Sequence, residues 1–182
     1  NADQDYDQIV SYGELWSTMI ISAYLSVALE QCSWMDAREL VRTDAKYRAA
    51  RVDWEISSLL MQESFASGEG QESIRYPLVL QGFIGSTEEG FTTTLGREGS
   101  DFSAAIFAYL LDAESVTIWK DVPGMFNADP NRFPDTKLLS HISYHEAIEL
   151  SYFGASVIHP RTLQPLQKKN IPLYVRSFVD LN

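Results

Sequence analysis

Glycines, one arginine and one aspartate mark the stretch from Leu80 to Ala105 as a place where chemistry could occur. A pair of glycines follows an apolar run, and a second glycine-rich loop with Arg97 leads into Ser100 and Asp101. Glycine lets a backbone approach a ligand closely, and the start of a helix offers unpaired N–H groups to an anion. Arg97 supplies a planar cation suited to a carboxylate or phosphate. The stretch is typical of a site for a small anionic substrate, but a hairpin followed by a capped helix fits the spacing equally well.

Glu14 and the pair Lys120–Asp121 also have both a functional and a structural interpretation. Glu14 lies near the expected start of a helix, where the helix dipole alone favours an acid, so its pattern by itself favours the structural interpretation. Lys120 and Asp121 follow a strand, and ligands of open α/β sheets collect at the carboxyl ends of strands. Their position therefore favours a functional role.

Several common catalytic motifs are missing from the sequence. It has neither of the two common phosphate loops, Gly-x-x-x-x-Gly-Lys-Ser/Thr and Gly-x-Gly-x-x-Gly, and no Gly-x-Ser-x-Gly elbow of a serine hydrolase. His141 and His145 stand four apart, but Ser143 between them is expected to cap a helix, so the rings should not share a face. We therefore expect no metal site there, and we interpret His159 as a structural hydrogen-bonding group.

The bulk composition is that of an ordinary globular domain, with 182 residues, 45% hydrophobic and 12% aromatic. Acidic residues outnumber basic ones 25 to 14, for a net charge of −11. This balance argues against nucleic acid or an anionic membrane as the main partner. The single cysteine, Cys32, excludes an internal disulfide, and no signal peptide or membrane-length apolar run is visible, so we expect a cytoplasmic protein.

Helix and strand patterns alternate along the chain, which predicts an α/β fold with a mostly parallel sheet. Residues 1–7 are mostly polar, which predicts a frayed N-terminal segment outside the first helix. Leu15, Met19, Ala23 and Val27 predict a helix over 11–30, starting near Ser11 or Gly13, with a broad buried face. The other predicted strands cover 75–84, 115–122 and 171–177, and a long loop covers 125–137. Two further helices are predicted over 52–65 and 160–169. A third helix is predicted to begin with Ser100 as its N-cap, and a fourth to run from a capping box at Ser143 to a C′ glycine at Gly154.

Five strings of residues, in this order, resemble the aspartokinase family and cover nearly the whole chain. The string Thr-Thr-Leu-Gly-Arg-x-Gly-Ser-Asp is highly specific, and separates aspartokinases from glutamate, acetylglutamate and uridylate kinases. The strings are Ser-Tyr-Gly-Glu-Leu-Trp-Ser-Thr from Ser11, Gln-Gly-Phe-Ile-Gly from Gln81, Thr-Thr-Thr-Leu-Gly-Arg-Glu-Gly-Ser-Asp from Thr92, Trp-Lys-Asp-Val-Pro-Gly-Met-Phe from Trp119 with Asp129-Pro130, and Phe-Gly-Ala-Ser-Val-Ile-His-Pro from Phe153.

The resemblance implies a three-layer α/β/α sandwich around a mainly parallel sheet. It also implies ATP-dependent phosphorylation of the side-chain carboxylate of L-aspartate, giving 4-phospho-L-aspartate, the opening step of lysine, threonine, methionine and isoleucine synthesis. ATP and Mg²⁺ are the implied cofactors, and the full-length protein is expected to be a homo-oligomer.

The resemblance also implies roles for seven residues. In the substrate half, Glu14 would receive the ammonium of aspartate, Arg97 would clamp its carboxylate and Ser100 would add a hydrogen bond, while Asp101 would organise the catalytic centre. In the nucleotide half, the residues that would border ATP are Lys120, Asp121 and Phe126.

Three departures from the family pattern shape the expectation for this chain. The family's Lys-Phe-Gly-Gly-Thr-Ser segment has no counterpart before Ser11, and the regulatory domains do not follow. Ser156 and Asn131 are neutral where many members carry lysine or arginine. We therefore expect residues 1–182 to be a partial catalytic domain with little kinase activity alone. Two alternatives remain, a non-catalytic aspartokinase-like scaffold and a kinase for another acidic amino acid such as glutamate.

Overall fold

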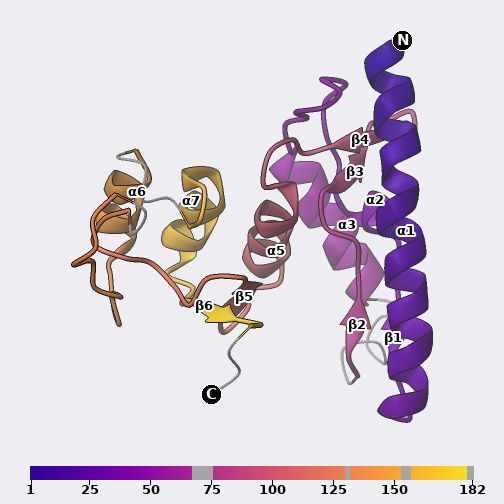
Figure 1. Cartoon of the computed structure of the whole chain (residues 1–182). Helices are drawn as coiled ribbons and strands as arrows, with labels where there is room; N and C mark the ends of the chain where they lie inside the picture. Colours follow the sequence, from indigo (N-terminus) through magenta and orange to yellow (C-terminus); the bar gives the residue numbers. More distant parts are fainter. Residues whose placement is uncertain (67–75, 130–131, 153–156, 180–182) are drawn as a thin grey trace. The chain divides into compact units, whose positions relative to one another are not determined.

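The computed structural model describes residues 1–66, 76–129, 132–152 and 157–179. Figure 1 shows the chain, which divides into two compact units, Asn1–Ser103 and Ala104–Asn182. The predicted catalytic domain over residues 1–182 contains both units and stays a prediction. No helix in the described part is both long and apolar enough to cross a membrane.

Unit 1 is built around one long helix, two short parallel strands and a hairpin. β1 pairs with β2 in parallel and β3 pairs with β4 in antiparallel register. Leu40, Val41, Ile84 and Leu95 are buried in its core. Its elements are α1 (Ala2–Ala28), β1 (Ser33–Trp34), α2 (Ala37–Leu40), α3 (Trp54–Ala66), β2 (Leu78–Val79), β3 (Ile84–Ser86), β4 (Thr92–Thr94) and the first turns of α5 (Gly99–Leu110).

Unit 2 has two parallel strands, two helices and the remainder of α5. β5 and β6 pair over five residues, from Val116 opposite Leu173 to Lys120 opposite Ser177. Ile158, Leu163 and Leu166 lie at the centre of its apolar core. Its elements are β5 (Val116–Lys120), α6 (Tyr144–Tyr152), α7 (Pro160–Lys169) and β6 (Leu173–Ser177). The α/β class predicted from the sequence is confirmed, and two of the three sheets among the described residues are parallel.

The prediction that residues 1–7 are frayed is wrong, because α1 begins at Ala2 with Asn1 as its N-cap. Asp7 is fully buried, and its carboxylate accepts hydrogen bonds from Thr94 N (2.8 Å), Thr94 Oγ1 (2.9 Å) and Arg48 N (2.9 Å). A buried carboxylate with three donors is a structural anchor. The helix therefore starts about nine residues before Ser11, and Glu14 lies within it, well beyond its first turn.

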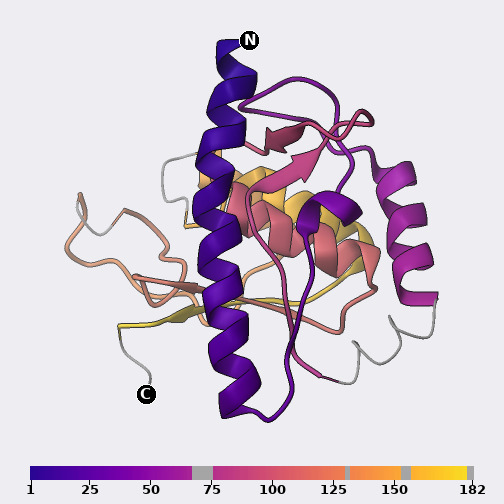
Figure 2. The same cartoon turned by 90° about the vertical axis from the view of Figure 1, so that its right-hand side faces the viewer.

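The predicted buried face of α1 is also wrong. Leu15 is buried, but Met19 and Val27 are 52% and 84% exposed. Figures 1 and 2 show α1 running the length of unit 1, and its contacts with β1, β2 and β4 come from one side. The residues buried on that side are mostly small and polar: Asp7, Ser11, Leu15, Thr18 and Ser22. Small side chains allow the helix to lie close to strand backbone, and the apolar stripe faces outward.

The single strand predicted over 75–84 is two strands with a break between them; residue 75 lies outside the described residues. β2 ends at Val79 and β3 begins at Ile84, because the chain turns at Phe83, whose φ is +71°. α5 begins at Gly99, so Ser100 lies inside the helix instead of capping it, while Asp101 is in the first turn as predicted.

The predictions for unit 2 are largely confirmed. The capping box is present, since Glu146 N donates to Ser143 Oγ (3.2 Å) and Ser143 N donates to Glu146 Oε2 (3.0 Å). Burial raises the pKa of Tyr144 to about 12, and its protonated hydroxyl donates to the Ile171 carbonyl. α7 has the predicted bounds, and His159 caps it by accepting from Arg161 N at 3.1 Å. Gly154 lies outside the described residues.

Candidate functional site

The two glycine-rich strings of unit 1 meet at the start of α5. A Cβ built on Gly82 would lie 3.0 Å from both Cα and Cβ of Ser100, and a Cβ on Gly99 would lie 2.6 Å from Phe83 Cδ2. Neither position tolerates a larger residue without displacement of its neighbour. The glycines are therefore required because the β2–β3 connection packs directly on the first turn of α5.

Hydrogen bonds fix this corner in place. Phe83 N donates to Ser103 Oγ at 2.8 Å, and Ser103 Oγ donates to the Gly99 carbonyl at 2.9 Å. Leu95 N donates to the Phe83 carbonyl at 2.8 Å. The left-handed backbone at Phe83 is thus bonded to α5 through Ser103 and to the segment after β4 through Leu95. These bonds fix the start of α5 relative to β3 and β4.

The loop before α5 presents the substrate-binding residues predicted from the sequence. Gly96 has φ +79°, and a Cβ there would lie 2.9 Å from the Arg48 carbonyl, so only glycine fits. Arg97 and Ser100 are exposed, and Asp101 is half-buried in the first turn of the helix. Arg97 has no side-chain hydrogen bond or ion pair among the described residues. The structure places Arg97, Ser100 and Asp101 together on one short segment.

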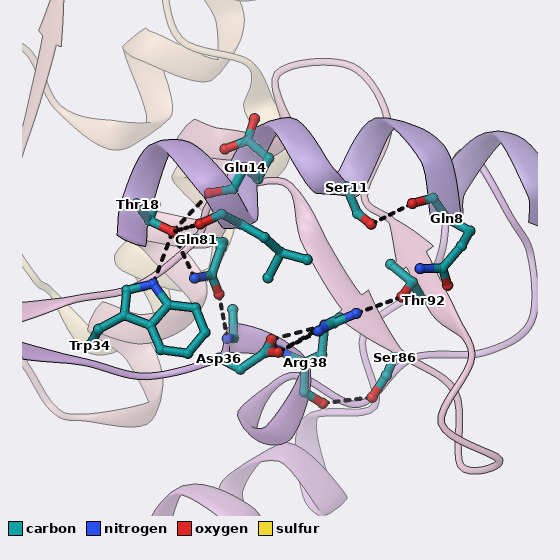
Figure 3. A network of polar contacts seen from close by, with 12 residues as sticks. Gln8, Ser11, Glu14, Thr18, Trp34, Asp36, Arg38, Gln81, Ser86 and Thr92 are labelled. Carbon is teal, nitrogen blue, oxygen red and sulfur yellow. Dashed lines mark hydrogen bonds and ion pairs between the residues drawn. The ribbon is translucent and has the colours of Figure 1, made fainter. Parts of the chain in front are cut away.

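Glu14 lies in the middle of α1, half-buried and without a hydrogen-bonding partner for its carboxylate among the residues described. Burial raises the pKa of this carboxyl above its ordinary value. Figure 3 shows the side chain pointing away from the polar network around Arg38. Glu14 forms no bond with Arg97, so the structure does not join these two predicted residues directly.

A polar network that the sequence interpretation missed supports α1 beside this site (Figure 3). Gln81 is 1% exposed, and its amide donates to Thr18 Oγ1 at 2.8 Å and accepts from Ala37 N at 2.7 Å. Trp34 Nε1 donates to the same hydroxyl at 3.1 Å, and that hydroxyl donates to the Glu14 carbonyl at 2.7 Å. The network therefore links the backbone of Glu14 to the segment that enters the glycine corner.

A second part of the network attaches α2 to the β3–β4 hairpin. The Arg38 guanidinium donates from Nε to Asp36 Oδ1 at 2.9 Å and from Nη1 to Thr92 Oγ1 at 3.1 Å. The hydrogen bond with Asp36 raises the pKa of Arg38, so this guanidinium stays charged. Asp36 also caps α2 by accepting from Arg38 N, a pattern recognisable in the sequence as an acid directly before a short run of good helix-forming residues. These groups are structural, because their donors and acceptors are used within the fold.

In unit 2 the predicted nucleotide residues follow the carboxyl end of β5. Lys120 is the last residue of the strand, and its carbonyl accepts from Phe178 N at 2.9 Å. Asp121 is exposed, and Phe126 is half-buried in a bridge with Leu138. The position of Lys120 and Asp121 at a strand end is as predicted.

A cavity of about 460 Å³ lies in unit 2 under the loop after β5. Its walls come from Pro123, Gly124 and Met125, from the segment around His141 and from β6. Lys120, Asp121 and Phe126 do not line it. Ser156 and Asn131 lie outside the described residues. Within the described ranges, no group of three or more His, Cys, Asp and Glu side chains could hold a metal ion.

Comparison with known proteins gives consistent matches. The model of the amino acid kinase family matches residues 2–177. The chain is 43% identical over 177 residues to bifunctional aspartokinase/homoserine dehydrogenase 2 of Zea mays, covering 97% of this chain and 19% of the relative. It is 39% identical over 178 residues to lysine-sensitive aspartokinase 3 of Escherichia coli, covering 96% and 38%. The chain thus spans about a fifth of the length of the bifunctional relatives.

Solved structures agree with these matches. E. coli aspartokinase III, in complex with aspartate and ADP, superposes with a TM-score of 0.88 at 38% identity, covering 98% of this chain and 39% of that one. Aspartate kinase from Synechocystis gives a TM-score of 0.75 at 27% identity, over 98% of this chain and 28% of its own. These superpositions confirm the amino-acid-kinase fold predicted from the sequence.

Proposed function

The chain belongs to the amino acid kinase family, and we propose that it is the catalytic part of an aspartokinase, which transfers the terminal phosphoryl group of ATP to the side-chain carboxylate of L-aspartate. The relatives named above are aspartokinases, and the structure most similar among those described binds aspartate and ADP. The product is 4-phospho-L-aspartate, the starting compound for lysine, threonine, methionine and isoleucine synthesis.

The observation that carries the proposal is the free guanidinium of Arg97 beside the rigid start of α5. Free aspartate has two carboxylates and one ammonium, and a guanidinium forms a paired hydrogen bond with a carboxylate. Glu14 offers a half-buried carboxylate that forms no ion pair among the described residues, and burial raises its pKa. We assign the substrate ammonium to Glu14, a substrate hydrogen bond to the exposed hydroxyl of Ser100, and the α-carboxylate to Arg97.

The chemistry of the reaction agrees with this set of residues. The nucleophile is a carboxylate whose ordinary pKa is about 4, so it is already ionised at neutral pH and needs no general base. Catalysis must then come from positioning and from positive charge around the transferring phosphoryl group. Asp101 would organise that charge instead of accepting a proton.

The nucleotide half of the proposal rests on the end of β5. Lys120 and Asp121 would border the phosphates and Phe126 the nucleoside, at a strand end where ligands of open α/β sheets collect. Mg²⁺ in such enzymes is held by substrate phosphates with one or two carboxylates, so the described residues need not form a closed metal cage by themselves. Asp101, as an organiser of positive charge, is the carboxylate that we assign to it.

Steady-state kinetics of the full-length protein would test the proposal. We expect kcat/KM for L-aspartate to exceed that for L-glutamate by at least about a hundredfold, as sites built on paired polar contacts discriminate strongly. Preference for glutamate would instead indicate a kinase for another acidic amino acid. Absence of turnover together with absence of calorimetric binding of aspartate or ATP would indicate a scaffold. The cytoplasmic location stays a prediction, since the plant relatives are named as chloroplastic.

A further inference from the structure

One buried side chain, Gln81, ties α1 to the segment that enters the glycine corner (Figure 3). It lies directly before Gly82 in the chain. Its amide donates to Thr18 Oγ1 on α1 at 2.8 Å and accepts at 2.7 Å from Ala37 N, the first residue of α2. Both ends of the amide are therefore used, and a buried polar group with fixed partners specifies how the elements around it are placed.

The direction of each hydrogen bond in this network follows from the groups at its ends. A backbone N–H only donates, so the amide atom that faces Ala37 is the oxygen, and the amide nitrogen faces Thr18. The indole of Trp34 also only donates, and it reaches the same hydroxyl at 3.1 Å. Thr18 then donates its one hydrogen to the carbonyl of Glu14 at 2.7 Å, with the carbonyl of Leu15 farther away at 3.1 Å. The network therefore has a single hydrogen-bonding arrangement.

A continuous path of contacts runs through this network from Glu14 to Ser100. Thr18 binds the carbonyl of Glu14, and Gln81 binds Thr18. Gln81 is followed by Gly82, which packs on the start of α5, since a Cβ added to the glycine would lie 3.0 Å from Cα of Ser100. The backbone of Glu14 is thereby fixed relative to the start of α5, although the two belong to distant parts of the sequence.

A hydrogen bond between buried groups fixes a distance in a way that an apolar contact does not. Hydrogen bonds have a narrow range of length and angle, whereas hydrophobic burial is non-directional. Thr18 is 8% exposed and Gln81 1%, so water competes little for their bond. The pair is suited to hold α1 and the glycine corner at one separation.

This separation matters for the choice of substrate. In the proposed function Glu14 receives the ammonium and Arg97 the α-carboxylate, and both groups are attached to the same carbon of the amino acid. When that carbon is fixed, the side-chain carboxylates of aspartate and glutamate end one methylene apart. A site distinguishes one methylene by about 10- to 200-fold, and a displacement of about 1 Å changes a rate by about 100-fold. Discrimination therefore requires that the groups holding the shared carbon do not shift.

We propose that the hydrogen bond between Thr18 and Gln81 is a positioning contact that sets the preference for aspartate over glutamate. Both residues act through others, Thr18 through the backbone of Glu14 and Gln81 through Gly82. The inference rests on the proposed function, because it takes Glu14 and Arg97 as the groups that hold the amino acid.

The ratio of kcat/KM for L-aspartate to kcat/KM for L-glutamate, measured on the full-length protein, tests this role. Thr18→Val removes the hydroxyl with little change of shape. We expect this ratio to fall at least about tenfold while the KM for ATP stays within about twofold of the parent value. Thr18→Ser keeps the hydroxyl and should restore most of the ratio.

Ser57→Ala is the matched control for a loss of stability alone. Ser57 is also a buried helix hydroxyl in unit 1, and it accepts from Arg42 N at 2.9 Å on α3. Its loss should lower the melting temperature, as Thr18→Val does, and leave the ratio of the two substrates at the parent value. An equal fall of the ratio in Ser57→Ala would overturn the proposal, because stability alone would then account for the effect.

Gln81→Met breaks the same contact from its other end and keeps the length of the side chain. The ratio should fall as it does in Thr18→Val, and the double variant should lose no more than the more affected single variant, because both substitutions remove one interaction. Losses that multiply in the double variant would overturn the proposal. So would a ratio that stays at the parent value in a folded Thr18→Val or Gln81→Met protein.

The parent enzyme separates failure of this inference from failure of the proposed function. A parent without preference for aspartate would contradict both. A parent that prefers aspartate, with variants that keep that preference, would support the proposed function and overturn only the positioning role of Thr18 and Gln81.

Discussion

Gly82 lies directly against Ser100: a Cβ added to the glycine would come within 3.0 Å of the Cα and Cβ atoms of the serine. The two residues belong to different segments of the chain, and their contact sets where α5 begins relative to the β2–β3 connection. Since Arg97 and Asp101 flank Ser100 on the same segment, the contact also sets the position of the proposed substrate-binding groups.

Replacing Gly82 by alanine should therefore damage both stability and substrate binding. The added methyl group must displace the first turn of α5, and overpacking of this kind costs about 1–3 kcal/mol. Urea denaturation should show that loss, and kinetics of the full-length protein should show a raised KM for aspartate. Gly13→Ala provides the contrast, because nothing lies within 4 Å of its Cβ and alanine favours the helix. If both variants are as stable as the parent, the contact does not constrain the fold.

Glu14 should weaken the fold at neutral pH while contributing to function. Burial raises the pKa of Glu14 in the folded state, so folding favours the protonated carboxyl. The resulting stabilisation is complete at a pH below the unfolded-state pKa of about 4.3. It is lost as the pH rises through the folded-state pKa. Glu14→Gln, which stays neutral, should have a higher melting temperature than the parent at pH 7, and the difference should vanish near pH 3.

The same variant should bind aspartate poorly. Losing a charge-assisted hydrogen bond to the substrate ammonium costs about 1.5–3 kcal/mol, which corresponds to a KM increase of about 10- to 150-fold. Glu63→Gln, an exposed acid on α3, should change neither KM nor the pH dependence of melting. An unchanged KM in Glu14→Gln would remove Glu14 from the substrate site.

Asp7 should prove to be one of the most sensitive positions in unit 1. Asp7→Asn keeps the shape but replaces one acceptor oxygen with a donor facing Thr94 and Arg48, whose N–H groups would be left unsatisfied. We expect a loss of about 2–4 kcal/mol in the free energy of unfolding, measured by urea denaturation. The exposed neighbour Asp5 is the control, and its asparagine variant should stay within about 0.5 kcal/mol of the parent.

The sequence predicted the elements of unit 2 better than those of unit 1. Local signals decide the helix ends there: the Ser143–Glu146 capping box begins α6, and His159 with Pro160 begins α7. Such signals involve residues two or three positions apart, and they do not depend on the rest of the fold.

In unit 1 the same reasoning failed where distant residues decide the outcome. The start of α1 depends on Asp7 bonding to Thr94, 87 residues away, which no local pattern reveals. The apolar stripe of α1 was recognised but assigned to the core, since hydrophobic periodicity alone does not say which partner covers a face. Gln81 and Thr18 likewise form their bond across 63 residues.

For the candidate site, glycine-rich strings located Arg97, Ser100 and Asp101 on one segment, as the structure shows. Their assignment to aspartate came from the family resemblance, because an exposed arginine at a helix start suits many anions equally well. The structure adds the reason for the glycines, namely the close packing of Gly82 and Gly99 on neighbouring segments.

The KM for L-aspartate of Arg97→Lys in the full-length protein tests the central claim most directly. Lysine keeps the charge but cannot reproduce the two parallel hydrogen bonds of a guanidinium. We predict that the aspartate KM rises at least about tenfold while the ATP KM stays within about twofold, and that Arg51→Lys, at an exposed arginine elsewhere in unit 1, changes neither. An unchanged aspartate KM in Arg97→Lys would contradict the proposal that this residue clamps the substrate carboxylate.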